Sequence, residues 1–204
     1  MLFRSEIPKI EEITEFCRSH LMRKNDFFIA ALSLAVALYN ECENVSFTWT
    51  WNGRQKIAEV LVAGFFIRDL PVALKTSSKM KLADFLKACE KQVSLGIKHG
   101  RCSYGMTGKS IDDAICFLYQ DNIYDASKID MGYEIIAVPK EEAYEILEIE
   151  LLDNSEGAAI IYGYDGGKYK EESMKRFAAL FLTVCDAFLE TSKNSEMTIG
   201  DIKQ

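Results

Sequence analysis

The chain contains two histidines, the side chain that most often carries acid-base chemistry near neutral pH. His20 lies near Cys17 in a segment of helical periodicity, and no second metal ligand stands within helical reach of it. His99 precedes the stretch Arg101–Tyr104, whose cysteine could act as a nucleophile beside a histidine. Such a pair needs a third group that orients the base, and no nearby residue supplies one. We therefore expect no Cys-His catalytic pair here.

The cysteines do not form a metal-binding or redox motif. They stand at positions 17, 42, 89, 102, 116 and 185, without the two-residue spacing of zinc and thioredoxin-like sites. Four of them lie inside apolar runs, where a thiol behaves as a small hydrophobic side chain: Cys17, Cys89, Cys116 and Cys185. The sequence thus predicts no metal site and mostly buried thiols in a reducing compartment.

Two other patterns resemble chemical motifs superficially. The glycines of GYDGGK do not have the P-loop spacing to Lys168, and no Ser or Thr follows that lysine, so the segment is interpreted as a strand-to-helix turn. Glu148 and Glu150 are paired carboxylates that alternate with apolar residues. We expect them on a solvated face at an exposed edge, where nothing desolvates either group to separate their pKa values.

Composition limits the class of protein further. The chain has 204 residues, 49% of them hydrophobic and 27% charged, which is ordinary for one globular domain. A net charge of -7 argues against general binding to nucleic acid or to an anionic membrane. No apolar run reaches the roughly 18 residues of a membrane span, and the N-terminus lacks a signal-peptide core. We expect a single soluble, cytoplasmic domain over residues 1–204.

The elements that must position any site follow from periodicity. Apolar residues at helical spacing predict a helix over Pro8–Met22, with Ile10, Ile13, Cys17 and Leu21 on one face. Asn25 or Asp26 is expected to cap a second, buried helix over Phe27–Asn40. Strict alternation predicts a strand over Val45–Trp51.

The remaining predicted elements complete an α/β pattern. One or two short strands with a bend at Gly64 are expected between residues 53 and 67, then a strand in LPVALK, a helix from Leu82 to about Gly100 and a loop over KHGRCSYGMTGKS. Further strands are predicted in AICFLY, YEIIAV, ILEIELL and AAIIYGY, before a last helix with a stripe from Met174 to Phe188. The fold class is a two-layer α/β sandwich with a mixed sheet packed by helices.

The order of several short motifs resembles the C-terminal lobe of a nonribosomal peptide synthetase condensation domain, of the chloramphenicol acetyltransferase-like superfamily. That family shows a strand ending in Gly-Arg, then Gly-x-Phe-x-Asn-Thr-Leu-Pro, a helix, a His-Gln-Asp-Val-Pro-Phe loop and a strand ending in Tyr-Gln-Asn. The matching residues here are Gly53-Arg54, Gly64, Phe66, Leu70, Pro71, His99, Tyr119, Gln120 and Asn122. The closing hairpin and helix also look similar, with Tyr164-Asp165 and Tyr169 at the expected places.

The resemblance implies roles for specific residues, and it has departures. The family's catalytic His-His-x-x-x-Asp-Gly belongs to the N-terminal lobe and is absent from these 204 residues, so we expect no activity from the chain alone. Arg68-Asp69 stands where Asn-Thr is usual, and the loop after His99 lacks Gln-Asp-Val-Pro. The implied interlobe or site-organising residues are Arg54, Arg68, Asp69 and Gln120, and the candidates for lining a tunnel are Gly64, Phe66 and His99. Arg54 would pair with the Asp of the missing motif. For Arg68-Asp69 a salt-bridged pair on an edge strand stays an open alternative.

The implied reaction is amide formation between carrier-bound acyl and aminoacyl thioesters, without a metal or a bound cofactor. The partners are an N-terminal condensation lobe and a peptidyl carrier protein that delivers phosphopantetheine arms. Candidate basic docking residues for an acidic carrier are Arg18, Arg23 and Lys24, or Lys98 and Arg101, with ordinary solvated surface charge as the alternative that we favour. Two alternatives stay open: a free-standing, noncatalytic lobe that binds a carrier or a partner lobe, and a small acyltransferase that builds its site between identical subunits.

Overall fold

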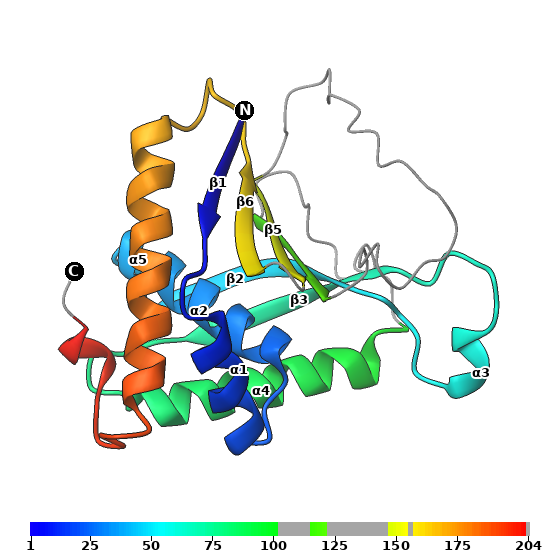
Figure 1. Cartoon of the computed structure of the whole chain (residues 1–204), viewed down its shortest axis with the longest axis horizontal. Coiled ribbons are helices and arrows are strands. Elements are labelled where there is room, and N and C mark those ends of the chain that lie inside the picture. The colour runs from blue at the N-terminus through cyan, green and yellow to red at the C-terminus, as the bar shows by residue number, and fades with distance from the viewer. Residues whose placement is uncertain (102–114, 122–146, 155–156, 203–204) are drawn as a thin grey trace.

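The computed structural model describes residues 1–101, 115–121, 147–154 and 157–202. It contains a six-stranded sheet with helices on one face (Figure 1). The elements in chain order are β1 (Leu2–Glu6), α1 (Ile10–Ser19), α2 (Lys24–Tyr39), β2 (Asn44–Trp51), α3 (Ile57–Val60), β3 (Arg68–Lys75), α4 (Leu82–His99), β4 (Ile115–Asp121), β5 (Leu147–Asn154), β6 (Gly157–Gly163), α5 (Glu171–Glu190) and the 3₁₀ turn η3 (Ile199–Asp201).

The sheet is mixed, as predicted. Its strand order is β1-β6-β5-β4-β2-β3. Strand β4 runs parallel to both of its neighbours, β2 and β5, while the other pairs are antiparallel. The two-layer α/β fold class expected from the sequence is therefore confirmed.

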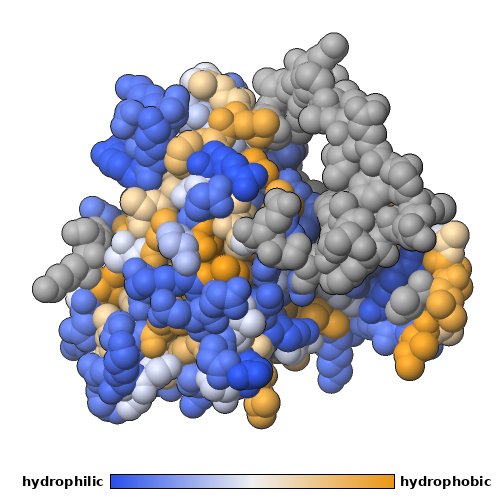
Figure 2. Space-filling view, in the orientation of Figure 1, coloured by the Kyte–Doolittle hydropathy of each residue, from blue (hydrophilic) through white to orange (hydrophobic). Residues whose placement is uncertain are grey.

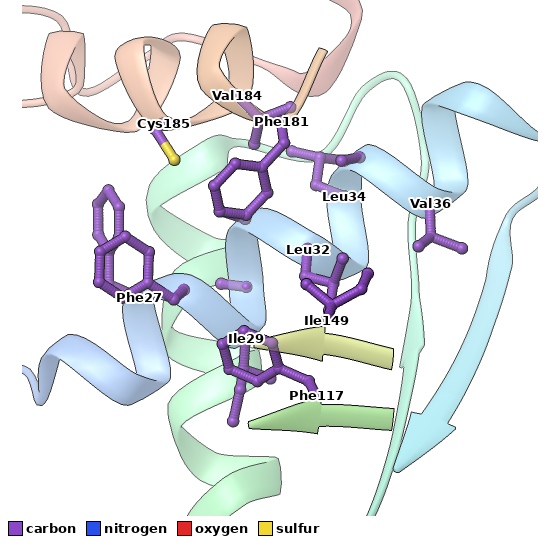
Figure 3. Close-up of a cluster of buried hydrophobic side chains, with 14 of the residues drawn as sticks. Phe27, Ile29, Leu32, Leu34, Val36, Phe117, Ile149, Phe181, Val184 and Cys185 are labelled. Atoms are coloured by element: carbon purple, nitrogen blue, oxygen red, sulfur yellow. The ribbon is translucent and has the colours of Figure 1, made fainter. Parts of the chain in front are cut away.

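Helix α2 is the centre of the core. Every residue from Asp26 to Ala37 is buried, because the helix packs against the sheet on one side and against α1, α4 and α5 on the others. Figure 3 shows how side chains of α2 meet those of β4, β5 and α5; the labelled residues are Phe27, Ile29, Leu32, Leu34, Val36, Phe117, Ile149, Phe181, Val184 and Cys185. Since neighbouring elements cover α2 on all sides, it needs no polar face towards solvent, which explains why its sequence is apolar nearly all round.

The helix starts and ends differ from expectation in detail. Helix α1 stops at Ser19, and Leu21 lies beyond it with a positive φ of 54° and 91% of its surface exposed. The amide of Met22 donates to the Cys17 carbonyl at 2.9 Å, which closes the helix in a Schellman-type turn, so Leu21 is not part of the apolar face. Neither Asn25 nor Asp26 caps α2, whose N-cap is Arg23.

Strand β1 had no counterpart in the sequence prediction. Its five residues show no clear alternation of apolar and polar types, and its pairing partner is β6, far along the chain. The N-terminal ammonium of Met1 donates to the Tyr164 carbonyl at 2.6 Å, which extends this contact beyond the strand. Local periodicity cannot reveal a strand that exists through such a distant partner.

The stretch between β2 and β3 contains no strand, which corrects the prediction for residues 53–67. It holds the single-turn helix α3, and β3 begins at Arg68, before the proline. Pro71 sits inside β3, opposite Thr48 of β2. It is tolerated because β3 is an edge strand of the sheet, where a missing amide costs no ladder bond on the open side.

Several other predictions can be placed. The strands in AICFLY, ILEIELL and AAIIYGY correspond to β4, β5 and β6, and the predicted second, third and last helices to α2, α4 and α5. His99 ends α4 instead of starting a loop. The predicted strand YEIIAV and the loop from Cys102 onward lie outside the described residues.

Three of the cysteines are buried in this core, as the sequence predicted. Burial raises the pKa of the Cys17 thiol to about 12 and also raises the pKa values of Cys89 and Cys185. Cys116 differs, because it lies half-buried on the face of the sheet that points away from the helices. The buried thiols are therefore packing residues with little thiolate character.

Candidate functional site

A single arginine organises the segment between β2 and β3, residues 52–67, which we call the Arg54 loop. Nη1 of Arg54 donates to the carbonyl oxygens of Glu59 and Val62, the latter at 2.9 Å. Nη2 donates to the Gly64 carbonyl at 3.4 Å. A guanidinium carries several donors in a fixed plane, so one side chain satisfies backbone groups along the whole loop.

An aromatic ring completes this arrangement. The ring of Phe66 lies under the guanidinium, with its centroid 4.2 Å from Cζ of Arg54. Gly53 adopts a φ of 72°, and a Cβ atom there would lie 1.7 Å from the Phe66 carbonyl oxygen. A side chain at Gly64 would approach the Phe66 ring to 3.1 Å. The structure therefore brings together Arg54, Gly64 and Phe66 of the predicted set, and adds Gly53 for steric reasons.

The Arg54 loop is fastened to the end of α4. The Glu59 carboxylate accepts from the backbone amides of Gln55 at 2.8 Å and Lys56 at 3.1 Å, and these hydrogen bonds lower its pKa. Arg101 reaches the same carboxylate at 3.4 Å, and Nε2 of Gln55 donates to the Ile97 carbonyl at 2.7 Å. Sequence reasoning missed Glu59 and Gln55, since neither belongs to a motif.

The outer surface of the Arg54 loop is apolar and faces solvent. Ile57, Leu61 and Phe65 are each more than 80% exposed: 87%, 85% and 82%. Figure 2 shows the corresponding hydrophobic surface over α3, at the right of the view. Large apolar side chains gathered on one projection mark an interaction surface more often than chance exposure does.

Arg68 and Asp69 do not form the salt bridge that stayed open as an alternative. Within the described part of the chain, Nη1 of Arg68 donates to the Ile67 carbonyl at 3.0 Å. Asp69 instead accepts from the hydroxyl of Thr50 on the neighbouring strand β2, at 2.8 Å. That hydroxyl also lies 3.6 Å from the Cys116 sulfur. Successive strand residues point to opposite faces, which keeps the two charged groups apart.

Gln120 and Glu150 form a second polar contact on the face of the sheet opposite the helices. The Gln120 side-chain amide donates to the Glu150 carboxylate. Burial raises the pKa of Glu150, and the hydrogen bond from Gln120 opposes this. The prediction of a solvated pair at an exposed edge was wrong, because β5 lies inside the sheet between β4 and β6. Alternation indicates a face but not whether a strand is central.

His99 and the predicted docking cations Arg18, Arg23 and Lys24 lie outside the Arg54 loop. His99 is exposed at the end of α4, and within the described residues its side chain forms no hydrogen bond with the Arg54 loop. Arg18 pairs with Glu15, Arg23 with the buried Asp26 and Lys24 with the buried Asp153, at 2.6, 2.8 and 2.5 Å. Two of the three cations of the first predicted patch thus serve internal ion pairs.

The described residues offer no group of three or more His, Cys, Asp or Glu side chains that could hold a metal ion. Within the same residues, none of the helices combines the length and the apolar character that crossing a bilayer requires. What the Arg54 loop can do chemically is recognition: it presents apolar side chains on a backbone fixed by Arg54.

Comparison with known proteins identifies the family. The model of the condensation domain family matches residues 4–202, so the chain belongs to that family. Its fold is similar to the condensation domain of the Monacolin K polyketide synthase MokA, with a TM-score of 0.78, 16% identity, and coverage of 97% of this chain and 48% of that one.

Two further structures give the same fold. The first condensation domain of the CDA synthetase matches with a TM-score of 0.73 and 13% identity, over 100% of this chain and 47% of that chain. The four-domain nonribosomal peptide synthetase AB3403 matches with a TM-score of 0.79 and 11% identity, over 100% of this chain and 17% of that one. This chain therefore spans about half the length of the condensation domains that it matches. No curated protein sequence matches it.

Proposed function

We propose that residues 1–204 act as the acceptor-side, C-terminal half of a condensation domain and take part in amide-bond formation between carrier-bound thioesters. The observation that carries this proposal is the Arg54 loop, with its exposed Ile57, Leu61 and Phe65. A loop that exposes this much apolar surface would be expected to collapse or to move. Here Arg54 and Glu59 hold its backbone through hydrogen bonds, so the apolar side chains project in a fixed arrangement.

The length of the chain supports an N-terminal condensation lobe as the partner of this surface. The matched condensation domains are about twice as long, and this chain aligns to about half of each. A second lobe of similar size is the part of the family architecture that these residues do not include. Burying the Arg54 loop against that lobe would remove its apolar side chains from water, at about 25 cal/mol per Å² of apolar area.

Arg54 fits a task at such an interface as well as within the loop. Its guanidinium makes hydrogen bonds to three carbonyl groups and stacks on Phe66, yet the side chain is still partly exposed. Guanidinium has five N–H donors, so one can still reach a carboxylate of the partner lobe. We assign Arg54 a positioning role towards the Asp of the His-containing motif, and no catalytic step.

The chemistry would be completed by the partner lobe and the carriers. The amine of the acceptor aminoacyl thioester attacks the carbonyl carbon of the donor thioester; a C–N bond forms, the C–S bond breaks, and the thiol leaves with the proton that the amine loses. A histidine of the partner lobe would position or deprotonate the amine, and two enclosed arms would be aligned between the lobes. The phosphopantetheine arms are part of the carrier-bound substrates.

The test is acyl transfer between two loaded peptidyl carrier proteins. We compare this chain alone with the chain mixed with a separately expressed N-terminal lobe that carries the His motif, and detect the dipeptidyl product by mass spectrometry. We expect product in the mixture and none from either part alone. Product from this chain alone would contradict the assignment of the base to the other lobe.

A binding experiment isolates the contribution of the Arg54 loop. Phe65→Asp is expected to weaken association with the N-terminal lobe at least about tenfold, because a charge would enter an apolar interface. Leu21→Asp is the matched control, since Leu21 is also exposed and lies outside the loop in a left-handed turn that Asp accepts. Equal weakening by both variants would show that general charge, and not this surface, governs association.

One other outcome would favour the noncatalytic alternative. If the chain binds the N-terminal lobe or a carrier protein tightly but no combination forms product, its task is binding without chemistry. The altered pair Arg68-Asp69 motivates this alternative, because it replaces residues that are uncharged in the family pattern.

A further inference from the structure

A hollow in the surface of the molecule lies far from the Arg54 loop. It has a volume of about 510 Å³ and opens between the C-terminal end of α2, the first turns of α5 and the starts of β4 and β5. Figure 1 places the start of α5 and helix α3 at opposite sides of the molecule. We call this hollow the α2–α5 cavity; its volume lies in the usual range for small-molecule sites.

The inner wall of the α2–α5 cavity is apolar and held by packing. Met174 and Phe177 of α5 are buried side chains of the core, and both line the cavity. Tyr39 of α2 packs edge-on against Phe177, with ring centroids 5.5 Å apart, and its hydroxyl donates to the Ser173 carbonyl at 3.4 Å. These contacts fix the wall, so a ligand would not have to order it on binding.

The rim of the cavity is cationic. Lys168, Lys170 and Arg176 line it, and none of the described residues that line it is Asp or Glu. Within the described part of the chain, the side chains of Lys170 and Arg176 make no ion pair or hydrogen bond. The nearest acidic residues in the sequence, Glu171 and Glu172, both pair with Lys175, which does not line the cavity.

This local charge contrasts with the rest of the chain, whose net charge is -7. Helix α5 contributes in the same direction, because it begins at the cavity with no side-chain cap on its first amides. Lys170 and Arg176, which pair with no carboxylate of the described residues and lie above an apolar wall, suit a ligand with an anionic end and an apolar body.

We propose that the α2–α5 cavity binds a small amphipathic anion, with its carboxylate or phosphate at Lys170 and Arg176 and its aliphatic or aromatic chain on Tyr39, Met174 and Phe177. The assignment is independent of the amide-forming role proposed above, since the cavity shares no residue with the Arg54 loop. The anionic group would fix the orientation of the ligand, and the apolar wall would select for its length.

The test uses octanoate, octyl phosphate and octylamine as probes in isothermal titration calorimetry. Octanoate and octyl phosphate are expected to bind saturably, and octylamine is expected not to bind. Inorganic phosphate should bind more weakly than octyl phosphate, because it lacks the alkyl chain. A preference between the two octyl anions distinguishes a carboxylate from a phosphate ligand. In protein labelled with ¹³C at the methionine methyls, the Met174 signal should shift more than that of Met80, which lies outside the cavity.

Charge variants separate this site from general attraction. Lys170→Gln with Arg176→Gln is expected to weaken octanoate binding about tenfold. Lys87→Gln with Lys91→Gln removes the same charge from exposed positions on α4 and should leave binding unchanged. Circular dichroism melting checks that both variants are folded. The proposal is overturned if octanoate does not bind, if both double variants weaken it equally, or if octylamine binds as well.

Discussion

Helix α2 and the Arg54 loop are both apolar in sequence, yet they are fixed by different means. Every residue from Asp26 to Ala37 of α2 is buried by neighbouring helices and the sheet. In the Arg54 loop, Ile57, Leu61 and Phe65 face solvent, and the backbone is fixed by hydrogen bonds to the side chains of Arg54 and Glu59. Burial stabilises the first region within the chain, whereas the second leaves apolar surface exposed, where the proposed partner lobe would bind.

This difference separates stability from recognition within one small fold. Substitutions in α2 should change the free energy of unfolding, because they leave cavities or unpaired buried groups. Substitutions in the Arg54 loop should change local order and binding, because little of its surface is buried within the chain. Four predictions test this division, in order of decreasing effect.

The largest effect is expected from removing a core ring. Phe28 of α2 is fully buried and packs against Tyr119 and Phe181, so Phe28→Ala should lower the free energy of unfolding by about 4 kcal/mol. Phe65→Ala makes the same chemical change in the Arg54 loop and should cost less than about 0.5 kcal/mol. Urea denaturation measures both. Similar losses for the two would remove the proposed distinction.

The next effect concerns the buried ion pair that ties α2 to the sheet. Nζ of Lys24 lies 2.5 Å from an Asp153 oxygen that also accepts from the Tyr119 hydroxyl at 2.8 Å. Asp153→Ala leaves both donors without this partner and should cost about 3 kcal/mol. Lys193→Ala, which breaks an exposed pair with Glu190, should cost no more than about 0.5 kcal/mol. Denaturation that ranks the two variants equally would contradict the role given to burial.

A smaller global effect and a larger local one are expected for Arg54→Ala. The free energy of unfolding should fall by about 1 kcal/mol, because the broken hydrogen bonds are near the surface. Hydrogen exchange of the amides in residues 55–66 should accelerate markedly, since the carbonyls of Val62 and Gly64 and the ring of Phe66 all lose the Arg54 guanidinium. Arg68→Ala is the control, because within the described part of the chain the Arg68 side chain donates only to the neighbouring Ile67 carbonyl. Unchanged exchange in the Arg54 variant would mean that other contacts order the loop.

The smallest effect is a dependence of stability on pH at the start of α2. Burial raises the pKa of Asp26 above its ordinary 3.8, although Arg23 opposes this, and among the described residues its Oδ1 atom has no hydrogen-bond partner. The folded state then holds this proton more tightly than the unfolded state, so this contribution to stability is present below pH 3.8 and is lost as pH rises through the raised pKa.

The measurement is urea denaturation at a series of pH values from 3.5 upward, compared between the wild type and Asp26→Asn. The variant should lack this loss of stability on deprotonation, so its stability relative to the wild type should increase across that range. Asp84→Asn, at an exposed position on α4, is the control and should follow the wild type. A parallel pH dependence of the wild type and Asp26→Asn would contradict the raised pKa.

Much of the fold could be predicted because its elements have strong local periodicity. The alternation in Val45–Trp51 and the helical spacing from Leu82 to Ile97 each correspond to an element of the structure, β2 and α4. The predictions that were missed or wrong depend on partners far along the chain. Strand β1 forms only by pairing with β6, and Glu150 lies in a central strand because β5 pairs with both β4 and β6. Leu21 fitted the helical spacing, but the chain turns before reaching it.

The candidate site divides in the same way. Motif order singled out Arg54, Gly64 and Phe66, and the structure places them together in one loop. The roles of Arg68, Asp69, Gln120 and His99 towards a partner lobe stay predictions. Glu59 and Gln55 could not be found, because their hydrogen bonds go to backbone groups, which carry no residue-specific signal.

By itself, the sequence determined most of the helices and strands, with β1 and residues 53–67 as exceptions, together with the mixed two-layer architecture and the family, because these follow from periodicity and from the order of motifs. The tertiary structure alone decided which apolar residues are buried, which strands lie at the edges and which carbonyl groups Arg54 holds. The physical reason is that burial and hydrogen bonding depend on neighbours brought together from distant parts of the chain, and the local pattern of residue types does not contain those neighbours.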